Sequence, residues 1–385
     1  MHSFFSNLSK MAKERTARIQ DLVGLLHSFF PPNLAEDWDN SGLQVGDPAA
    51  EVRRVLVALD PSPAALERAA ELGAEALLTH HPLLLKPIRS LTPSDETGRV
   101  LLGAARQGVA VLCAHTNLDR AADGLNDWLA GRLGIAEPRP LARGDADLLK
   151  LVVYVPAGHE EVVAEALFAA GAGRIGAYDR CSFRVAGTGT FRPGEGTSPF
   201  LGRQGETEEA AELRLETILP RSLVARAVDK MTRAHPYEEV AYDLLPLANR
   251  RADVGLGRIG RLPESRTLDE FATQVKEALG CRALRVVGEA GARVARAAVC
   301  GGSGASLLAE ASRQGADVLV TGDLKYHEAR LAESLGVMVI DAGHFATERI
   351  VVPELVQRLA GPAGQRGLNI EFLEMGEEND PFRVV

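Results

Sequence analysis

The sequence has few cysteines, no surplus of basic residues and no long apolar run, and each of these absences excludes a class of protein. Its 385 residues include four cysteines, none of them in a CxxC pair, so we expect no thiolate zinc site and a reducing, cytoplasmic location. A formal net charge of -9 offers no basic stripe for a phosphate backbone, which makes nucleic acid a poor partner. No run has the length of a membrane span or a signal peptide, so we expect no membrane insertion.

The composition is that of a globular protein, with 46% hydrophobic and 25% charged residues, and a chain of this length can form two or three cores. Residues 52–135 alternate β-branched runs with amphipathic helical stretches, and the same alternation returns after residue 293. This pattern predicts a parallel sheet with covered faces, in one layered α/β domain built from residues 1–144 and 253–385. Met11 is an alternative start to Met1, because the first amphipathic pattern begins only after it.

The middle of the chain follows a different order. Between residues 147 and 247 the pattern reads strand, helix, strand, strand, helix, strand, which is the order of a ferredoxin-like α+β domain. We therefore expect an inserted domain over residues 145–252 that folds by itself. Its inner strands are joined by a loop rich in Gly, Pro and Glu, which should be exposed.

Two segments, 171–176 and 255–260, match the G-x-G-x-x-G pattern of dinucleotide-binding turns. That fingerprint requires a strand before it and a helix that starts inside it. The first copy follows a predicted helix and leads into a strand, and the second runs into RLPES before the next helix. We therefore interpret both as turn or close-packing glycines.

Two adjacent histidines, His80 and His81, end an apolar run in LLTHHPLLL. Successive side chains of a strand point to opposite faces, and Pro82 favours an extended His81. If the chain stays extended, the two imidazoles diverge, so they could serve two neighbouring ions more easily than chelate one. The alternative is that they pack in the core or around a site.

Two other predicted strands also end in polar residues. His115 and Asp119 follow VAVLCA, while His344 and Glu348 follow VMVIDA and are spaced to share one face of a helix. Ligands bind beyond the carboxyl ends of strands in open parallel sheets, so these side chains could meet at one edge of the sheet. As alternatives, Asp119 could cap the next helix, and His344 with Glu348 could form a surface pair.

These strand ends offer three imidazoles and two carboxylates, a nitrogen and oxygen set that suits Zn, Fe, Mn, Co or Ni. Five ligands are too many for one tetrahedral ion and too few to saturate two. The count therefore fits two divalent ions per chain, with a bridging carboxylate and water in the remaining positions. The predicted ligands are His80, His81, Asp119, His344 and Glu348.

A glycine-rich turn and the start of a helix are further candidates. Backbone N–H groups of the turn could bind phosphate or another anion; the alternative is a tight strand-to-helix turn. The segment TGDLKYHEA adds Asp323, Lys325, Tyr326 and His327 to the same edge of the sheet. Lys325 could steer an anion there, and His327 could move a proton. An ordinary polar helix start explains these residues equally well. The turn consists of Gly301, Gly302, Ser303 and Gly304.

The segment LAEDWDNSGLQVGD places Trp38, Asp39, Asn40 and Gly42 in a turn. Its simplest role is to cap the preceding helix and to pack Trp38 against the sheet.

In this order, the motifs WDNSGLQVGD, LLTHHPLLL, AHTNLD, GGSG, DVLVTGDLKYHEA and DAGHFATE resemble the GTP cyclohydrolase 1 type 2 homologue family, also called NGG-interacting-factor-like proteins. The insert is similar to the middle domain of longer bacterial members, through GRIGAYDRCSFRVAGTGTFRP and AHPYEEVAYDLLPL. The resemblance implies a two-metal centre with the five predicted ligands and Glu348 as the bridge. It also implies a toroidal homohexamer whose metal sites face an internal cavity, and a middle domain related to the trimeric copper-tolerance and nitrogen-regulatory folds.

Two functions are compatible with these features. The first is a metal-dependent hydrolase acting on a nucleotide such as GTP or on a phosphoester, with His115 or His327 moving protons. The second is a non-enzymatic, hexameric metal-binding or regulatory assembly whose insert senses a small ligand.

Overall fold

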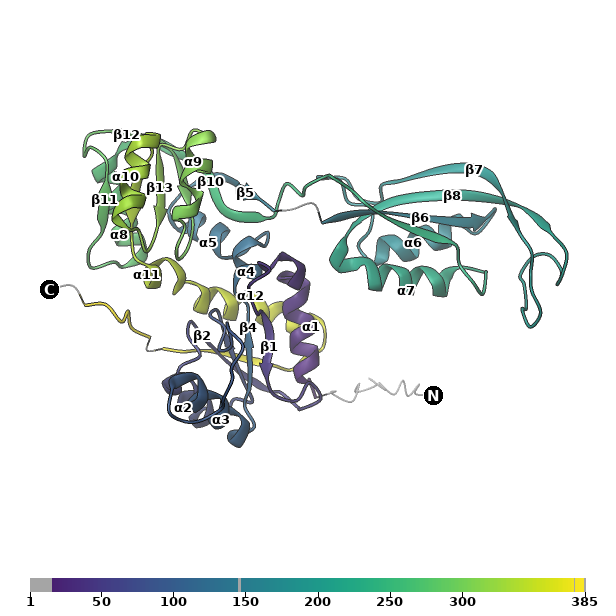
Figure 1. Ribbon diagram of the computed structural model, residues 1–385, viewed down its shortest axis with the longest axis horizontal. Helices are drawn as coiled ribbons and strands as arrows, with labels where there is room; N and C mark the ends of the chain where they lie inside the picture. The colour runs from purple at the N-terminus through teal and green to yellow at the C-terminus, as the bar shows by residue number, and fades with distance from the viewer. Residues whose placement is uncertain (1–15, 145–146, 377, 384–385) are drawn as a thin grey trace, which may run out of the picture. The chain divides into compact units, whose positions relative to one another are not determined.

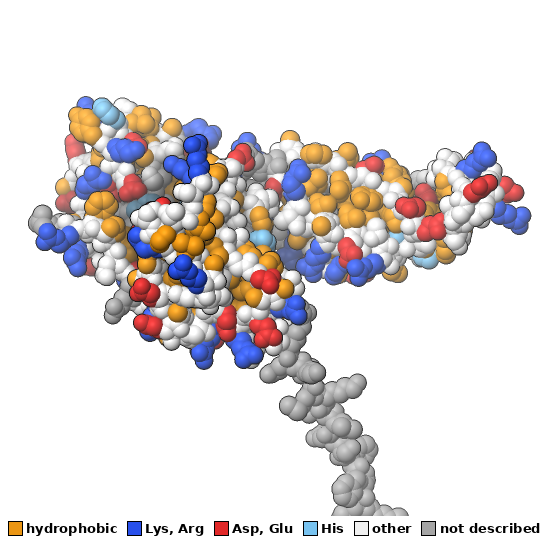
Figure 2. Space-filling model, turned by 60° about the horizontal axis from the view of Figure 1, so that its bottom comes forward, with side chains coloured by type: hydrophobic (Ala, Val, Ile, Leu, Met, Phe, Trp, Pro, Cys, Tyr) orange, Lys and Arg blue, Asp and Glu red, His pale blue; other side chains and the backbone are white. Residues whose placement is uncertain are grey.

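The chain forms two compact units in the computed structural model, which describes residues 16–144, 147–376 and 378–383 (Figure 1). The first unit combines Met1–Ala142 with Asp253–Val385, and the second is Arg143–Ala252. Both candidate start residues, Met1 and Met11, lie outside the described residues. Within the described ranges, no helix has the length and apolarity needed to cross a bilayer. Acidic and basic side chains are interspersed over the face in Figure 2, so no basic stripe crosses that face.

The first sheet of the first unit has a parallel centre with one antiparallel edge strand. Two of its inner strands are buried along their whole length, which explains why they read as continuous apolar runs. Two helices, α2 (Pro63–Glu71) and α3 (Glu96–Gln107), pack through Leu66 and Val100 against one face of this sheet. The strand order is β1 (Gly42–Val45), β4 (Ala110–Cys113), β3 (Ala76–Thr79), β2 (Arg54–Ala58) and β15 (Glu371–Glu374), and β1 is the antiparallel member.

The second sheet repeats this plan with the later part of the chain. Its three central strands are parallel, and antiparallel strands flank them on both sides. Helices α9 (Leu308–Arg313) and α10 (Tyr326–Leu335) cover one face. The strand order is β11 (Arg285–Val287), β14 (Met338–Asp341), β13 (Val318–Thr321), β12 (Arg293–Val299), β10 (Gly255–Thr267) and β5 (Ala136–Arg143).

The predicted α/β class is confirmed, but the first unit contains two sheets rather than the single sheet that the strand pattern predicted. The physical reason is that flanking strands occupy both edges of each parallel centre, so the two centres cannot pair with each other. The two chain segments are nevertheless interleaved. Strand β5 of the first segment joins the second sheet, and β15 of the second segment joins the first sheet.

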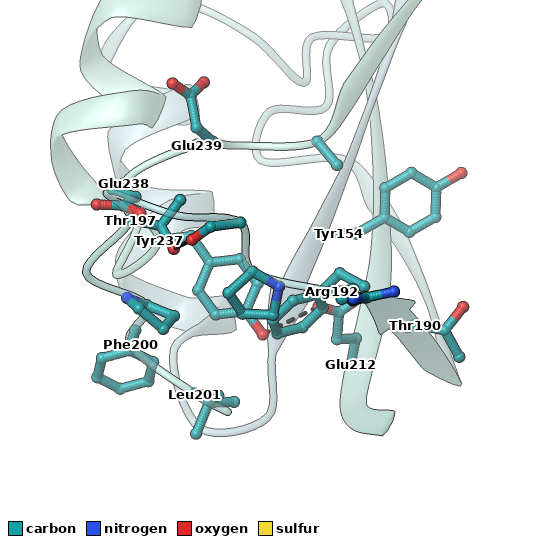
Figure 3. A pocket seen from close by; sticks show the side chains of 16 residues that line it. Tyr154, Thr190, Arg192, Thr197, Phe200, Leu201, Glu212, Tyr237, Glu238 and Glu239 are labelled. Atoms are coloured by element: carbon teal, nitrogen blue, oxygen red, sulfur yellow. Dashed lines mark hydrogen bonds between the residues drawn. The ribbon is translucent and has the colours of Figure 1, made fainter. Parts of the chain in front are cut away.

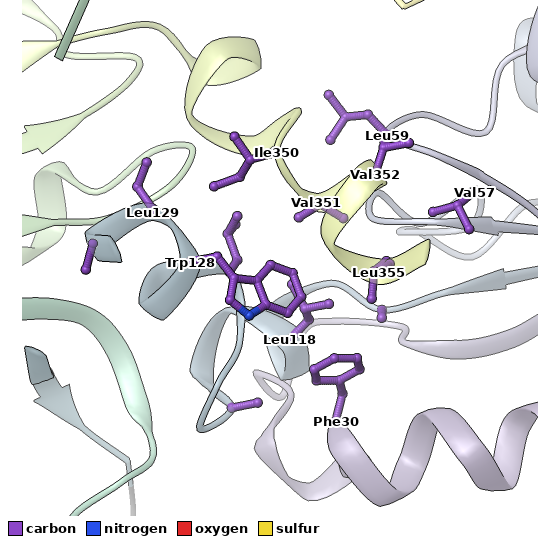
Figure 4. Packing of buried hydrophobic residues seen from close by; sticks show 14 of the residues in the cluster. Phe30, Val57, Leu59, Leu118, Trp128, Leu129, Ile350, Val351, Val352 and Leu355 are labelled. Carbon is purple, nitrogen blue, oxygen red and sulfur yellow. The ribbon is translucent and has the colours of Figure 1, made fainter. Parts of the chain in front are cut away.

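A shared apolar core fills the space between the two sheets. Trp128 belongs to this core, with its ring edge-on to Phe30 at a centroid distance of 6.3 Å and with Leu118, Ile350 and Leu355 nearby (Figure 4). The core joins the two sheets into one unit and fixes the ends of their strands relative to each other. The helices that contribute to it are α1 (Ile19–Phe29), α4 (Thr116–Arg120), α5 (Leu125–Arg132), α8 (Leu268–Leu279), α11 (His344–Glu348) and α12 (Val351–Gln365).

The second unit is a four-stranded antiparallel sheet with the strand order β7-β8-β6-β9. This is the order of a ferredoxin-like domain, which confirms the predicted class of the insert. Its core forms where Leu151 and Val153 of the sheet pack against Val163 and Met231 of the two helices. The elements are β6 (Leu148–Pro156), α6 (Glu160–Ala169), β7 (Ser182–Phe191), β8 (Glu208–Pro220), α7 (Val224–Ala234) and β9 (Tyr242–Pro246).

The second G-x-G-x-x-G segment, 255–260, lies inside strand β10, as its interpretation as packing glycines requires. Gly257 has a φ of +64°, and the turn of the backbone there brings two carbonyl oxygens to the buried guanidinium of Arg258. The same guanidinium donates two hydrogen bonds of 2.7 Å to the Asp127 carboxylate. The segment therefore anchors α5 to the second sheet through a buried ion pair.

Candidate metal centre

The carboxyl ends of both sheets in the first unit face one cluster of polar side chains. In the first sheet, polar residues follow three parallel strands within two positions of the strand end, and the second sheet contributes two more strand ends. Because parallel strands all end at the same edge, each sheet delivers its side chains to one side of the cluster. These residues are Asp60 after β2, His80 and His81 after β3, His115 after β4, Asp323 after β13 and His344 after β14.

Glu348 lies at the centre of this cluster. Its carboxylate is 4% exposed, and its Oε2 lies 2.9 Å from Nε2 of both His81 and His344. Its other oxygen, Oε1, lies 3.7 Å from Nε2 of His80. The two oxygens of Glu348 thus face two different sets of imidazole nitrogens.

The expectation that His80 and His81 diverge is wrong. Their ring centroids are 5.1 Å apart, and one ligand atom each of His80, His81 and Glu348 lie within 4.8 Å of one another. The chain bends after β3 instead of remaining extended, and the Thr79 hydroxyl stabilises the bend by donating to the His81 carbonyl at 2.6 Å. Both imidazoles consequently reach the same carboxylate, and this cluster could hold a metal ion.

Two buried atoms in the cluster lack hydrogen-bond partners among the described residues: Nε2 of His80 and Oδ1 of Asp119. They lie 3.6 Å apart. A buried polar atom without a partner is costly, and such atoms are rare unless a water or an ion satisfies them. Asp119 lies within α4 and Gly124 precedes α5, so Asp119 does not cap the next helix. A nitrogen and an oxygen ligand atom facing each other without a proton donor fit a divalent cation.

Each of the three imidazoles is held in place by its other ring nitrogen. Nδ1 of His80 donates to the Ala114 carbonyl at 2.8 Å, that of His81 to Asp60 at 2.7 Å, and that of His344 to Asp323 at 2.7 Å. Hydrogen bonds of this kind fix the tautomer and the orientation of metal-binding histidines, and here they leave Nε2 directed at the cluster.

The charges of the cluster are strongly coupled. Burial favours the neutral form of Glu348, but hydrogen bonds from His344 and His81, together with the nearby His80 imidazole, outweigh it and lower the pKa of Glu348 well below its usual value. Burial also lowers the pKa of His81, but Asp60 and Glu348 outweigh it and raise the pKa to about 10. Burial raises the pKa of Asp119 to about 7. A cation at the cluster has to displace bound protons, so its binding releases them.

The glycine-rich turn does not form the predicted anion site. The N–H of Gly301 donates to Asn126, that of Gly302 to Thr347 and that of Gly304 to Thr321, so three of the four N–H groups already have protein acceptors. The turn instead makes space, because a Cβ at Gly302 would lie 2.2 Å from Oε1 of Glu348.

His115 borders the cluster, and its hydrogen-bond partner is Asp39, a residue that the sequence pattern predicted to cap a helix. Its ring centroid is 5.3 Å from that of His80, and its Nδ1 donates to Asp39 at 2.8 Å. Asp39 therefore orients His115 and does not cap the preceding helix as predicted. Trp38 is 59% exposed and does not pack on the sheet as predicted; its ring meets the His115 ring edge-on at 6.0 Å.

Among the described residues, His327 makes no hydrogen bond or ring contact with a member of the cluster. It is exposed in the first turn of α10, and its ring contacts that of Tyr326 at 5.3 Å. Lys325 and Tyr326 are exposed as well, and the backbone N–H of Lys325 donates to Glu328, as at an ordinary helix start. These contacts do not test the role of His327 in moving protons, which stays a prediction.

A family model described as Duf34/NIF3 (NGG1p interacting factor 3) matches residues 17–381. The chain belongs to the Duf34/NIF3 family. Within this family, it is 41% identical over 372 residues to the GTP cyclohydrolase 1 type 2 homolog of Halalkalibacterium halodurans, covering 96% of this chain and 100% of that protein.

Two further Duf34/NIF3 relatives are similar to this chain over nearly its whole length. The GTP cyclohydrolase 1 type 2 homolog of Bacillus subtilis is 39% identical over 364 residues, which cover 94% of this chain and 97% of the relative. The crystal structure of a Bacillus cereus protein related to NIF3 superposes with a TM-score of 0.87 at 39% identity, covering 96% of this chain and 100% of that one. Both units of the chain are thus shared with these relatives.

Proposed function

We propose that this Duf34/NIF3 member is a metal-dependent hydrolase that binds two divalent ions per chain. The observation that carries the proposal is the pair of unpartnered buried ligand atoms, Nε2 of His80 and Oδ1 of Asp119, beside the carboxylate of Glu348. His80 and Asp119 would hold one ion on the Oε1 side of Glu348. His81 and His344 would hold the other on the Oε2 side, with Glu348 shared between the two.

The mixed imidazole and carboxylate donors suit Zn best, and Fe, Mn, Co or Ni also suit them. Ions bound there would supply positive charge that polarises a substrate oxygen. Glu348 would hold the two ligand sets in a fixed position relative to each other, because its single buried carboxylate contacts both. Asp60 and Asp323 would hold two of the imidazoles with Nε2 facing inward.

His115 would hold and move a proton at Nε2. Its Nδ1 proton is committed to Asp39, whose own hydrogen bonds from His115 and Thr116 outweigh burial and keep the pKa of Asp39 below its usual value. An imidazole fixed in this way by a buried carboxylate is suited to general acid–base catalysis. The relatives are called GTP cyclohydrolase 1 type 2 homologs, which makes GTP the first substrate to test, with simple phosphoesters as the second class.

The test combines metal analysis with turnover. Elemental analysis of the purified protein should find about two divalent ions per chain, and the Zn- or Mn-loaded protein should hydrolyse GTP or p-nitrophenyl phosphate. His80→Asn and Glu348→Gln should lose both metal and turnover, whereas Glu96→Gln, an exposed carboxylate at the start of α3, should lose neither. Undiminished turnover in the two metal-site variants would eliminate this centre as the catalyst.

We also propose that the chain forms a toroidal homohexamer. Light scattering coupled to size-exclusion chromatography measures the mass of the assembly and so tests this. If the protein holds two ions but turns over neither class of substrate, the non-enzymatic metal-binding assembly becomes the better description.

A further inference from the structure

A second site lies in the ferredoxin-like unit. A cavity of about 400 Å³ opens between Tyr154 of β6, the end of β7, Glu212 of β8 and two loops, one that follows β7 and one that joins α7 to β9. All of its lining residues fall between Tyr154 and Ala241, so it belongs to this unit alone. It is independent of the metal centre, and its volume is that of a small-molecule site.

The walls of this cavity are largely aromatic. The Tyr237 ring lies 5.8 Å from that of Phe191 and 6.2 Å from that of Phe200. Figure 3 shows the Tyr237 ring between Phe200 and the Glu212 carboxylate. Phe200 is 50% exposed, and outside the cavity its ring meets that of His159 edge-on at 5.3 Å. Aromatic faces that line a concavity offer a surface for an apolar or cationic group.

A buried carboxylate, Glu212, forms the polar end of the cavity. It is 9% exposed, and its Oε1 accepts a hydrogen bond of 3.0 Å from the Tyr237 hydroxyl. Among the described residues, none donates a hydrogen bond to Oε2, and no lysine or arginine lies within ion-pair distance of this carboxylate. Burying a carboxylate without a cationic partner costs free energy of folding. A bound cation would compensate this cost.

The surrounding backbone is built to accommodate this carboxylate. Glu212 pairs with Gly187 across strands β7 and β8, and its carboxylate lies over Gly189, where a Cβ would be 2.1 Å from Oε2. On the other side, Nε2 of His235 donates to the Tyr154 carbonyl, and Nδ1 accepts from the N–H of Tyr237. This clamp fixes the Tyr237 backbone. Burial and the hydrogen bond to Glu212 raise the pKa of the Tyr237 hydroxyl, which therefore stays a donor.

The charge of the lining selects the sign of the ligand. Three glutamates line the cavity, Glu212, Glu238 and Glu239, against one arginine, Arg192. Glu238 accepts a hydrogen bond from the Ser198 N–H and so ties the loop before Phe200 to the rim. The lining therefore carries an excess of negative charge next to aromatic faces, which is the combination that recognises organic cations.

We propose that this cavity binds a small organic cation, an ammonium group carried on an apolar body. The ammonium group pairs with Oε2 of Glu212, and the apolar body lies against the rings of Phe200 and Tyr237. The inference goes beyond the hydrolytic function and does not depend on it.

The test uses the full-length protein and ligand-observed saturation-transfer NMR. Benzylammonium is the probe, and benzyl alcohol is its neutral counterpart of nearly equal size. We expect benzylammonium to bind at least about tenfold more tightly than benzyl alcohol, because only the cation gains the ion pair and the cation–π contact. This comparison is made on the unaltered protein, so it does not depend on the folding of any variant.

Variants then locate the site. Glu212→Gln keeps an acceptor for the Tyr237 hydroxyl but removes the charge, so it should weaken benzylammonium by about tenfold and leave benzyl alcohol unchanged. The matched control is Glu209→Gln, which removes an exposed carboxylate of β8 that does not line the cavity and should change neither affinity more than about twofold. Equal binding of the two probes, binding of neither, or full affinity in Glu212→Gln would overturn the proposal. Binding of guanosine without benzylammonium would also overturn it, in favour of a neutral nucleobase ligand.

Discussion

Replacing Gly302 by alanine should damage the metal centre while leaving the fold in place. A Cβ at this position would lie 2.2 Å from Oε1 of Glu348, 3.1 Å from its Cδ and 3.2 Å from Cε1 of His344. The backbone cannot withdraw, because the Gly302 N–H donates to Thr347 and its carbonyl accepts from the Gly322 N–H at 2.8 Å and from the Thr321 hydroxyl. The side chain that has to move is therefore Glu348.

The magnitude has two parts. The φ of +60° at Gly302 costs a residue with a Cβ about 1–2 kcal/mol of stability. Displacing Glu348 removes a contact shared by His81 and His344. Since losing even an outer partner of a ligand lowers metal affinity by about 10–100-fold, we expect Gly302→Ala to lose at least about 100-fold. Calorimetric titration with Zn, together with elemental analysis, measures both affinity and stoichiometry.

Gly336 provides a matched control. Its φ is +69°, and a Cβ there would meet nothing within 4 Å. Gly336→Ala should lose a similar amount of stability, because the backbone strain is the same, yet it should keep the metal. If Gly302→Ala binds metal with unchanged affinity and stoichiometry, Glu348 does not hold the ions in the way we propose.

Three further outcomes follow from other contacts. Asp127→Ala leaves the guanidinium of Arg258, which is 1% exposed, without its carboxylate, so the free energy of unfolding should fall by about 3–5 kcal/mol in a denaturant titration; a loss below about 1 kcal/mol would contradict the ion pair. Asp60→Ala removes the acceptor of Nδ1 of His81 and should lower metal affinity by about 10–100-fold in competition with a chromophoric chelator. Unchanged metal affinity would show that the contact with Asp60 does not hold His81 in place as a metal ligand. Asp39→Ala should leave the metal content intact and lower turnover, and equal turnover would remove Asp39 and its imidazole partner from the reaction.

Residues at strand ends were the most predictable part of the centre. Apolar runs mark the parallel strands, and the rule that ligands gather at their carboxyl ends selects His80, Asp119 and His344 without knowledge of the fold. Asp60 satisfies the same rule, since it follows β2, but a single aspartate after a strand is common. Only its contact with His81 distinguishes it.

Contacts between distant segments were not predictable in the same way. The N–H groups of the glycine-rich turn are satisfied by Asn126, Thr321 and Thr347, and no local pattern shows that these side chains lie beside the turn. The bend that brings His80 and His81 together likewise depends on the Thr79 hydroxyl, whose acceptor is known only once the chain has turned. In both places the sequence leaves alternatives open, and tertiary contacts decide between them.

The exchange of β5 and β15 between the two sheets has a consequence for biosynthesis. The edge of β2 finds its neighbour only when residues Glu371–Glu374 arrive, more than 300 positions later in the chain. A nascent polypeptide on the ribosome must therefore keep an apolar sheet edge exposed, with the insert already free to fold, until translation has passed residue 374. We expect such intermediates to be targets for chaperones, because an unpaired edge of this kind invites aggregation.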